Sequence, residues 1–117
     1  MRKIYYLATC STCIRIIKEL GITESNFEIQ DIKSQPITAD QIDEMKALSG
    51  NYESLFSRRA MKYKSMGLAD QNLAEEDYKR LIVEEYTFLK RPVFIINREI
   101  FIGNSKKVVE AVHAKIS

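Results

Sequence analysis

Near the N-terminus, one stretch decides the fold: Lys3-Ile4-Tyr5-Tyr6-Leu7-Ala8-Thr9-Cys10-Ser11-Thr12-Cys13-Ile14-Arg15-Ile16-Ile17-Lys18-Glu19-Leu20-Gly21. Its first part, from Lys3 to Ala8, is short, apolar and β-prone, which predicts a buried strand. After Cys13 the isoleucines and Leu20 have helical spacing, and Gly21 is typical of a helix C-cap. The stretch therefore predicts a strand, a turn that carries two cysteines, and a helix.

The two cysteines of this turn are the only ones among the 117 residues. A disulfide between them would close almost no loop of the unfolded chain and would add little stability. Cys10 lies where the predicted helix begins, and there unpaired N–H groups and the helix dipole favour a thiolate. Cys13 is within reach of the Cys10 sulfur, so Cys10 can attack and Cys13 can resolve a mixed disulfide. The pattern predicts redox chemistry.

Two other interpretations of the cysteine pair stay open. One is half of a zinc site, but tetrahedral zinc needs four protein ligands. The sequence offers no second cysteine pair and a single histidine, His113. The other is a purely structural pair. We predict that the chain holds no metal.

Beyond the first helix, strand and helix patterns alternate. Residues 26–32 alternate polar and apolar, which predicts a second strand, parallel to the first. Thr38 and Gln41 form a capping-box pattern for a helix over residues 39–49. Short helices are expected between residues 50 and 72, and a longer helix over residues 74–88.

The C-terminal part predicts a β-hairpin and a last helix. Residues 93–96 and 100–102 are apolar and flank a turn. Ser105 can cap a helix that runs to about residue 115. The order β-α-β, helices, β-β-α predicts an α/β fold in a single domain, residues 1–117, with a helical insertion at about residues 38–88.

Composition and charge limit the classes of function. Hydrophobic residues make up 45% of the chain and charged residues 29%, the balance of a soluble globular protein. Basic and acidic residues nearly balance, with a formal net charge of +2, whereas a general nucleic-acid binder has an excess of basic residues. We therefore expect no direct contact with nucleic acid. The N-terminus lacks the apolar region of a signal peptide, and no run approaches a membrane span. We expect a cytoplasmic protein that does not bind membranes.

Arg59, Arg91 and Pro92 are further candidate site residues. Arginine can grip a tetrahedral oxyanion with two N–H groups, although most arginines are solvated surface residues. From the sequence alone, Arg58 is as usable as Arg59. Pro92 stands at the start of a predicted strand, a position that proline suits in any fold.

In its motifs the chain resembles the ArsC-like family of the thioredoxin-like superfamily, which contains glutaredoxin-coupled arsenate reductases and Spx-type transcriptional regulators. The motifs span nearly the whole chain: residues 6–13 (YLATCSTC), 55–59 (LFSRR) with Tyr63 and Gly67-Leu68, 89–93 (LKRPV) and 102–103 (IG). The resemblance implies a thioredoxin-like fold, with a mixed four-stranded sheet flanked by helices and an inserted helical subdomain. It also implies a monomer, and a cis peptide bond before Pro92 that faces the active cysteine.

The same resemblance implies roles for individual residues. Cys10 is the expected nucleophile, with Cys13 as the second thiol, and Arg59 and Arg91 are expected to hold an oxyanion beside Cys10. A reductase would use glutathione as co-substrate, glutaredoxin as partner and no bound cofactor. A Spx-type regulator would use a Cys10–Cys13 disulfide as a switch and would bind RNA polymerase. A family member that has kept the fold and lost the chemistry is the third alternative.

The chain departs from the reductase pattern at three places. Reductases often carry an arginine directly after the fourth position of the cysteine motif, where this chain has Ile14. They carry a third oxyanion-binding arginine near the end of the sheet, where this chain has Lys106 and Lys107. The histidine upstream of the cysteine is missing, because Tyr6 and Leu7 occupy that neighbourhood. The choice between arsenate and another substrate therefore stays open.

Overall fold

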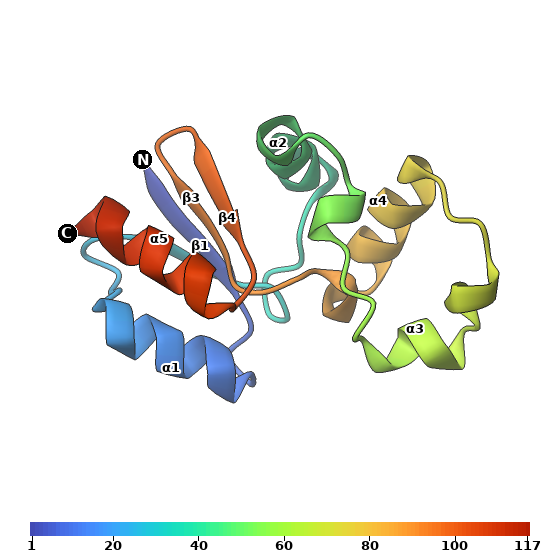
Figure 1. Ribbon diagram of the computed structural model, residues 1–117, viewed down its shortest axis with the longest axis horizontal. Coiled ribbons are helices and arrows are strands. Elements are labelled where there is room, and N and C mark those ends of the chain that lie inside the picture. The colour runs from blue at the N-terminus through green and yellow to red at the C-terminus, as the bar shows by residue number, and fades with distance from the viewer. The chain divides into compact units, whose positions relative to one another are not determined.

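The computed structural model describes all residues from Met1 to Ser117, and the chain separates into two compact units (Figure 1). The first, the sheet unit, consists of Met1–Gln35 and Arg91–Ser117. The second, the helical unit, consists of Pro36–Lys90. A helical segment is thus inserted between two parts of the chain that share one sheet.

The sheet unit contains four strands in the order β2-β1-β3-β4. β1 (Arg2–Tyr6) pairs in parallel with β2 (Glu28–Asp31) and antiparallel with β3 (Val93–Ile96). β3 in turn pairs antiparallel with β4 (Glu99–Ile102). The mixed four-stranded sheet that the family resemblance implies is confirmed, and so is the parallel pairing predicted for the first two strands.

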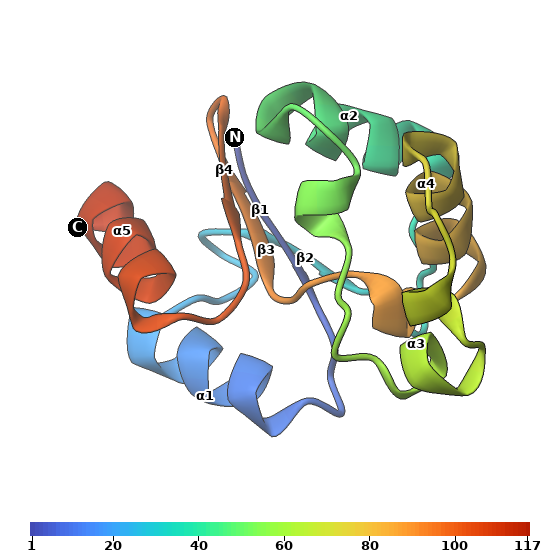
Figure 2. The ribbon, with the colours of Figure 1, turned by 45° about the vertical axis from the view of Figure 1, so that its right-hand side comes forward.

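Two helices, α1 (Ser11–Leu20) and α5 (Lys106–Ile116), cover one face of this sheet (Figure 2). Ile4 of β1 and Phe94 of β3 are register partners, so both side chains point to that face. Burial of such a side chain contributes about 1.5–3 kcal/mol. The core between the sheet and the two helices consists of Ile4, Ile16, Leu20, Ile22, Phe27, Phe94, Ile96 and Val112.

The helices of the sheet unit end and begin at the residues that the sequence indicates. Gly21 closes α1 in the left-handed region, at φ 66°, where a side chain would be strained. The Ser105 hydroxyl accepts the N–H of Val108 at 3.2 Å and so caps α5. Both ends of α1 are thus defined by specific residues, and the cysteines lie at its N-terminus.

The helical unit contains α2 (Ala39–Ser49), α3 (Met61–Ser65) and α4 (Glu75–Glu84), with three 3₁₀ turns, η1 (Glu53–Leu55), η2 (Leu68–Asp70) and η3 (Tyr86–Phe88). The predicted capping box of α2 is confirmed. The Thr38 hydroxyl accepts the N–H of Gln41 at 3.1 Å, and the Gln41 side chain accepts the N–H of Thr38 at 3.1 Å. The predicted short helices between residues 50 and 72 are also present.

An aromatic cluster forms the centre of the helical unit. Phe56 is fully buried and stacks on Phe88, with 5.0 Å between ring centroids. Tyr78 of α4 packs against the same ring at 4.9 Å, and Tyr63 meets it edge-on at 6.0 Å. These contacts join η1, α3, α4 and η3 around one side chain.

The long helix predicted over residues 74–88 is wrong at its C-terminal end, because α4 ends at Glu84 and η3 follows. The Ser57 N–H donates to the Phe88 carbonyl at 2.6 Å, and the Lys90 N–H donates to the Leu55 carbonyl at 2.8 Å. This short antiparallel pairing needs extended backbone after Phe88. A helix that continued to Arg91 would remove it.

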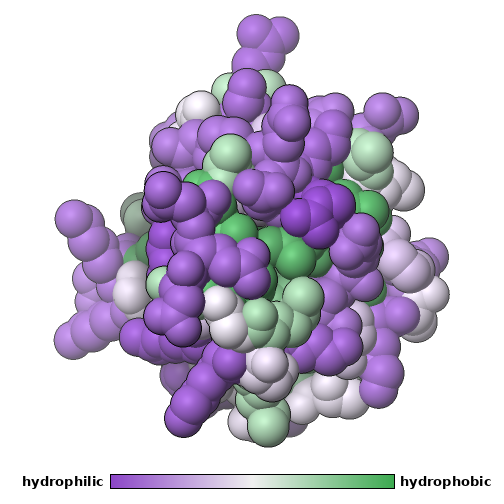
Figure 3. All heavy atoms as spheres, turned by 90° about the vertical axis from the view of Figure 1, so that its right-hand side faces the viewer, coloured by the Kyte–Doolittle hydropathy of each residue, from purple (hydrophilic) through white to green (hydrophobic).

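The surface is mainly hydrophilic on the face that lies to the right in Figure 1, and apolar side chains show through near its centre (Figure 3). Such limited apolar exposure is ordinary for a folded domain. None of the helices combines the length and the apolar character needed to cross a bilayer.

Candidate active site around Cys10

The turn between β1 and α1 places Cys10 at the N-cap of α1, as the sequence predicts. The Cys10 N–H donates to the Leu7 carbonyl at 2.9 Å, and the Cys10 carbonyl accepts the N–H of Ile14 at 3.1 Å. The first bond closes the turn, and the second begins the helix. Cys10 is partly exposed, whereas Cys13, in the first helical turn, is fully buried.

The surroundings of Cys10 favour its thiolate. Burial opposes ionisation, but the polar neighbours outweigh it, so the pKa of the Cys10 thiol lies below its ordinary value. The N–H and the thiol of Cys13 and the N–H of Thr12 hydrogen-bond to the sulfur, and Arg91 adds a positive charge. The two N–H groups belong to the open N-terminal turn of α1, where the helix dipole acts in the same sense.

Cys13 has the opposite character. Burial, together with the neighbouring Cys10 sulfur, raises the pKa of its thiol from 9.0 to about 11. The backbone of Leu7 and the charge of Arg91 act in the other direction without offsetting the burial. Both cysteines are free thiols in the structure. At neutral pH, Cys10 is therefore the better nucleophile and Cys13 keeps its proton.

Arg91 and Pro92 lie at the same end of the sheet as the cysteines. Tyr5, near the end of β1, is opposite Val93, the first residue of the antiparallel β3. The peptide bond between Arg91 and Pro92 is cis, as predicted. Pro92 is buried, and its carbonyl accepts the N–H of Gly103 at 2.9 Å, which ties the start of β3 to the end of β4.

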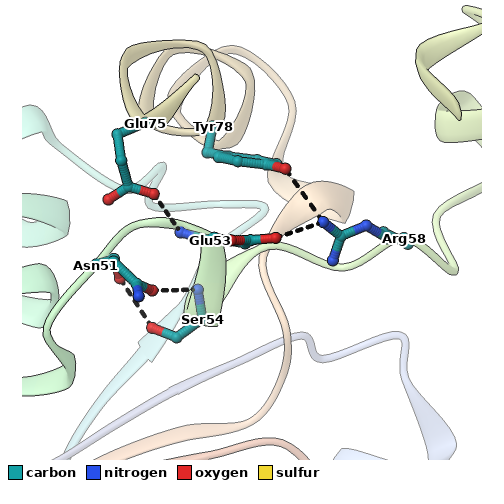
Figure 4. A network of polar contacts seen from close by, with 6 residues as sticks. All are labelled: Asn51, Glu53, Ser54, Arg58, Glu75 and Tyr78. Carbon is teal, nitrogen blue, oxygen red and sulfur yellow. Dashed lines mark hydrogen bonds and ion pairs between the residues drawn. The ribbon is translucent and has the colours of Figure 1, made fainter. Parts of the chain in front are cut away.

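Arg58 and Arg59, which the sequence does not distinguish, have different surroundings in the helical unit, and Figure 4 shows those of Arg58. Arg58 Nη2 donates to Glu53 Oε2 at 2.7 Å and to the Tyr78 hydroxyl at 3.1 Å. Its guanidinium also lies over the Tyr78 ring, 5.8 Å from the centroid. Arg59 is exposed and forms no ion pair with a carboxylate. Arg58 is thus engaged within the unit, whereas the side chain of Arg59 is exposed.

The segment before these arginines is anchored to α4 and to its own turn (Figure 4). Glu75 accepts the N–H of Tyr52 at 2.7 Å and the N–H of Glu53 at 3.1 Å through its two carboxylate oxygens. Asn51 Oδ1 accepts the N–H of Ser54 at 2.8 Å. These bonds satisfy the N–H groups at the start of η1 and hold the segment that leads to Arg58.

Comparison with known proteins assigns the chain to a family, because the model of the ArsC family matches residues 5–112. The chain belongs to the ArsC family. The global transcriptional regulator Spx of Bacillus subtilis (strain 168) is 23% identical over 104 residues, which cover 88% of this chain and 79% of that protein.

Solved structures of ArsC-like proteins have the same fold. The arsenate reductase from Vibrio cholerae superposes with a TM-score of 0.76 at 17% identity, over 93% of this chain and 95% of its own. A protein named YFFB has a TM-score of 0.80 at 17% identity and is covered over 100% of both chains. The thioredoxin-like fold expected from the sequence is confirmed.

Within this ArsC fold, the structure brings four of the five predicted site residues into the sheet unit: Cys10, Cys13, Arg91 and Pro92. Arg59 belongs to the helical unit, and its contact with a substrate stays a prediction. Lys106 and Lys107, in the region where the resemblance would place a third arginine, are exposed in the first turn of α5. No group of three or more His, Cys, Asp or Glu side chains is placed to hold a metal ion.

Sequence analysis missed one residue that contacts the cysteine turn. Asp31, at the end of β2, accepts the N–H of Ala8 at 3.2 Å. It also accepts the N–H of Lys33 at 3.3 Å and the hydroxyl of Ser34 at 3.1 Å. An aspartate at a strand end, with a serine three residues later, is a sequence signal for the hydrogen bonds to Lys33 and Ser34. Nothing in the sequence signals the bond to Ala8, because it depends on the pairing of β1 with β2.

Proposed function

We propose that the protein is a thiol-based oxidoreductase in which Cys10 attacks an oxyanion or a disulfide, with glutathione and glutaredoxin as reductants. The observation that carries the proposal is the opposite shift of two pKa values, lowered for Cys10 and raised to about 11 for Cys13. A nucleophile needs an accessible thiolate, and a resolving thiol must stay protonated until the mixed disulfide has formed. Membership of the ArsC family supports the same chemistry.

On an oxyanion, the Cys10 thiolate attacks the central atom and forms a sulfur bond to it, while one oxygen leaves as water after taking up protons. A glutathione thiolate then attacks the Cys10 sulfur, the bond to the central atom breaks, and its electron pair stays on that atom. Two thiols have become one disulfide between Cys10 and glutathione, and the oxyanion has gained two electrons. A glutaredoxin thiolate then attacks the glutathione sulfur of this disulfide and releases the Cys10 thiolate. The charge of Arg91 beside Cys10 would attract the anion and stabilise the charge that develops on it.

On a disulfide substrate, the Cys10 thiolate attacks one sulfur and releases the other as a thiolate. Cys13 then loses its proton to the departing group and attacks Cys10, which releases the second thiolate. The product is a Cys10–Cys13 disulfide, and two glutathione thiols or a dithiol glutaredoxin reduce it. Either route requires a reducing compartment, and we therefore propose that the protein acts in the cytoplasm.

The test is arsenate-dependent oxidation of NADPH with glutathione, glutaredoxin and glutathione reductase supplied. Turnover by the wild type that vanishes in Cys10→Ser supports the oxyanion route. Turnover with a glutathione mixed disulfide and none with arsenate selects the disulfide route. Unchanged turnover in Cys10→Ser, with either substrate, rules out the proposed nucleophile.

A second function, a redox-sensing regulator of the Spx type that binds RNA polymerase, is favoured by a specific observation. The Cys13 thiol acts directly on the Cys10 sulfur, so the two sulfurs are neighbours, as a disulfide switch requires, and glutaredoxin-coupled arsenate reduction does not require a second cysteine. The likeness to the regulator Spx supports this alternative. Retention of purified RNA polymerase on the immobilised protein, compared under oxidising and reducing conditions and with Cys13→Ser, tests it. Equal retention of RNA polymerase under oxidising and reducing conditions, and by the wild type and Cys13→Ser, would contradict a disulfide switch.

A further inference from the structure

Asp31 links the end of β2 to the turn that carries Cys10. We propose that Asp31 is a positioning residue, whose carboxylate holds the Ala8–Cys10 turn so that the Cys10 sulfur stays at the N-terminal end of α1. The inference rests on the proposed role of Cys10 as the nucleophile and extends it to a residue on another strand.

The carboxylate of Asp31 is itself held in place on several sides. Its backbone pairs with Tyr6 of β1, and its carbonyl accepts the N–H of Gln35 at 2.8 Å. The N–H of Lys33 and the hydroxyl of Ser34 orient the two carboxylate oxygens. Oδ1 is thereby directed to the N–H of Ala8 at 3.2 Å. A carboxylate held in this way can fix the position of a loop, because it loses little conformational entropy when it accepts the N–H of Ala8.

The turn depends on few bonds. β1 ends at Tyr6, whose carbonyl accepts the N–H of Ile32 at 2.9 Å, and the chain then leaves the sheet. The Ala8–Asp31 bond, the Cys10–Leu7 bond and the contact of the Leu7 backbone with the Cys13 sulfur hold the next four residues. Hydrogen bonds to the Cys10 sulfur weaken steeply with misalignment. Loss of the Asp31 bond therefore weakens the N–H contacts that favour the Cys10 thiolate.

The charge of Asp31 and its hydrogen bond to the turn predict opposite changes in the pKa of Cys10 when Asp31 is substituted, which makes the proposal testable. Asp31 is an anion near the turn, so removal of its charge alone lowers the pKa of Cys10. Removal of the hydrogen bond raises that pKa, because the thiolate loses N–H contacts. Asp31→Asn removes the charge and keeps an Oδ1 acceptor, whereas Asp31→Ala removes both. Asp31→Glu keeps the charge but displaces the acceptor. Arg91, whose positive charge lowers the pKa of Cys10, is unchanged in all three.

The experiment measures the rate at which Cys10 reacts with 4,4′-dithiodipyridine as a function of pH. It is done in the Cys13→Ser background, where Cys10 is the only thiol of the chain. Far-UV circular dichroism and thermal unfolding establish that each variant is folded. The control is Glu28→Ala, which removes a carboxylate from the same strand, one that pairs with Lys3 at 3.2 Å and has no bond to the turn.

We expect Asp31→Ala and Asp31→Glu to raise the pKa of Cys10 by about one unit, which lowers the thiolate fraction about tenfold at any pH well below the pKa of the parent. Because a more basic thiolate is about threefold more nucleophilic, the net rate in that pH range falls about threefold. Asp31→Asn should keep or lower the pKa, and Glu28→Ala should leave it unchanged.

Equal pKa values in Asp31→Asn, Asp31→Ala and Asp31→Glu would overturn the positioning role. So would a pKa in Asp31→Ala below that of the parent, since charge would then dominate. The comparison among variants decides on Asp31 whatever the parent value is. Turnover in Cys10→Ser decides separately on the proposed function.

Discussion

Cys10 and Cys13 hydrogen-bond to each other through their side chains, and the pKa of one is lowered while that of the other is raised. Two identical side chains three residues apart thus differ because one lies at the open end of α1 and the other is buried beneath it. The helix terminus stabilises the negative charge on Cys10, and burial penalises it on Cys13. This difference assigns attack to Cys10 and resolution to Cys13 in the proposed chemistry.

Cys10→Ser should abolish reductase activity, because a serine hydroxyl is not ionised at neutral pH and cannot replace the thiolate. Cys13→Ser should only weaken it and should accumulate Cys10 as a mixed disulfide with glutathione, because nothing resolves the adduct. Intact-mass spectrometry after incubation with oxidised glutathione measures the adduct. A glutathione adduct on Cys10→Ser but not on Cys13→Ser would reverse the two roles.

The buried Cys13 thiol should make the free energy of unfolding depend on pH in the alkaline range. Its pKa is about 11 in the folded protein and 9.0 without the fold, so the folded state binds the proton more tightly. The resulting stability, about 3 kcal/mol for a shift of this size, is present below pH 9 and lost as the pH rises to 11.

Urea unfolding from pH 8 to pH 11 measures this dependence. Cys10→Ser is compared with the double variant Cys10→Ser/Cys13→Ser, so that tyrosines and lysines titrate equally in both proteins. The difference in unfolding free energy between them should decrease as the pH rises. A difference that stays constant from pH 8 to pH 11 would contradict the raised pKa of Cys13.

Arg58 and Arg59 form a matched pair for testing oxyanion binding. Arg59→Ala should lower kcat/KM for the oxyanion roughly 10- to 100-fold, the value of a hydrogen bond to a charged group, and leave stability unchanged. Arg58→Ala should leave KM unchanged and lower stability by up to about 1 kcal/mol, because it loses the exposed pair with Glu53. Steady-state kinetics and urea unfolding of both variants test this assignment. The opposite pattern would make Arg58 the anion ligand.

The aromatic cluster of the helical unit should depend on Phe56. Phe56→Ala should lower the free energy of unfolding by about 3–5 kcal/mol, the usual cost of such a truncation in a packed core. Phe56→Leu keeps most of the buried volume and should cost much less. Denaturant unfolding of the two variants measures the difference. Equal losses in both variants would mean that stability depends on the aromatic ring of Phe56, which stacks on Phe88, and not on the buried volume.

Much of the fold follows from local sequence signals. The helical spacing after Cys13, the left-handed cap at Gly21 and the capping box at Thr38 and Gln41 depend on neighbours within four residues. Such signals work because the groups that satisfy a helix end lie in the adjacent turn. The end of α4 was the exception, since Glu85 takes an extended conformation (φ −138°, ψ 107°) and η3 follows it.

The sequence by itself determined the order of elements, the place of Cys10 at the start of a helix, and the cysteine pair as the centre of the proposed chemistry. Only the tertiary structure decided which side chains surround that centre. Arg91 acts on Cys10 because β3 pairs antiparallel with β1, and Asp31 reaches Ala8 because β2 pairs in parallel with it. Arg58 and Arg59 differ because a glutamate and a tyrosine engage only the first. The physical reason is the same in each case: charge and hydrogen bonding act over a few ångströms, and distances between residues far apart in sequence are set by strand pairing and packing.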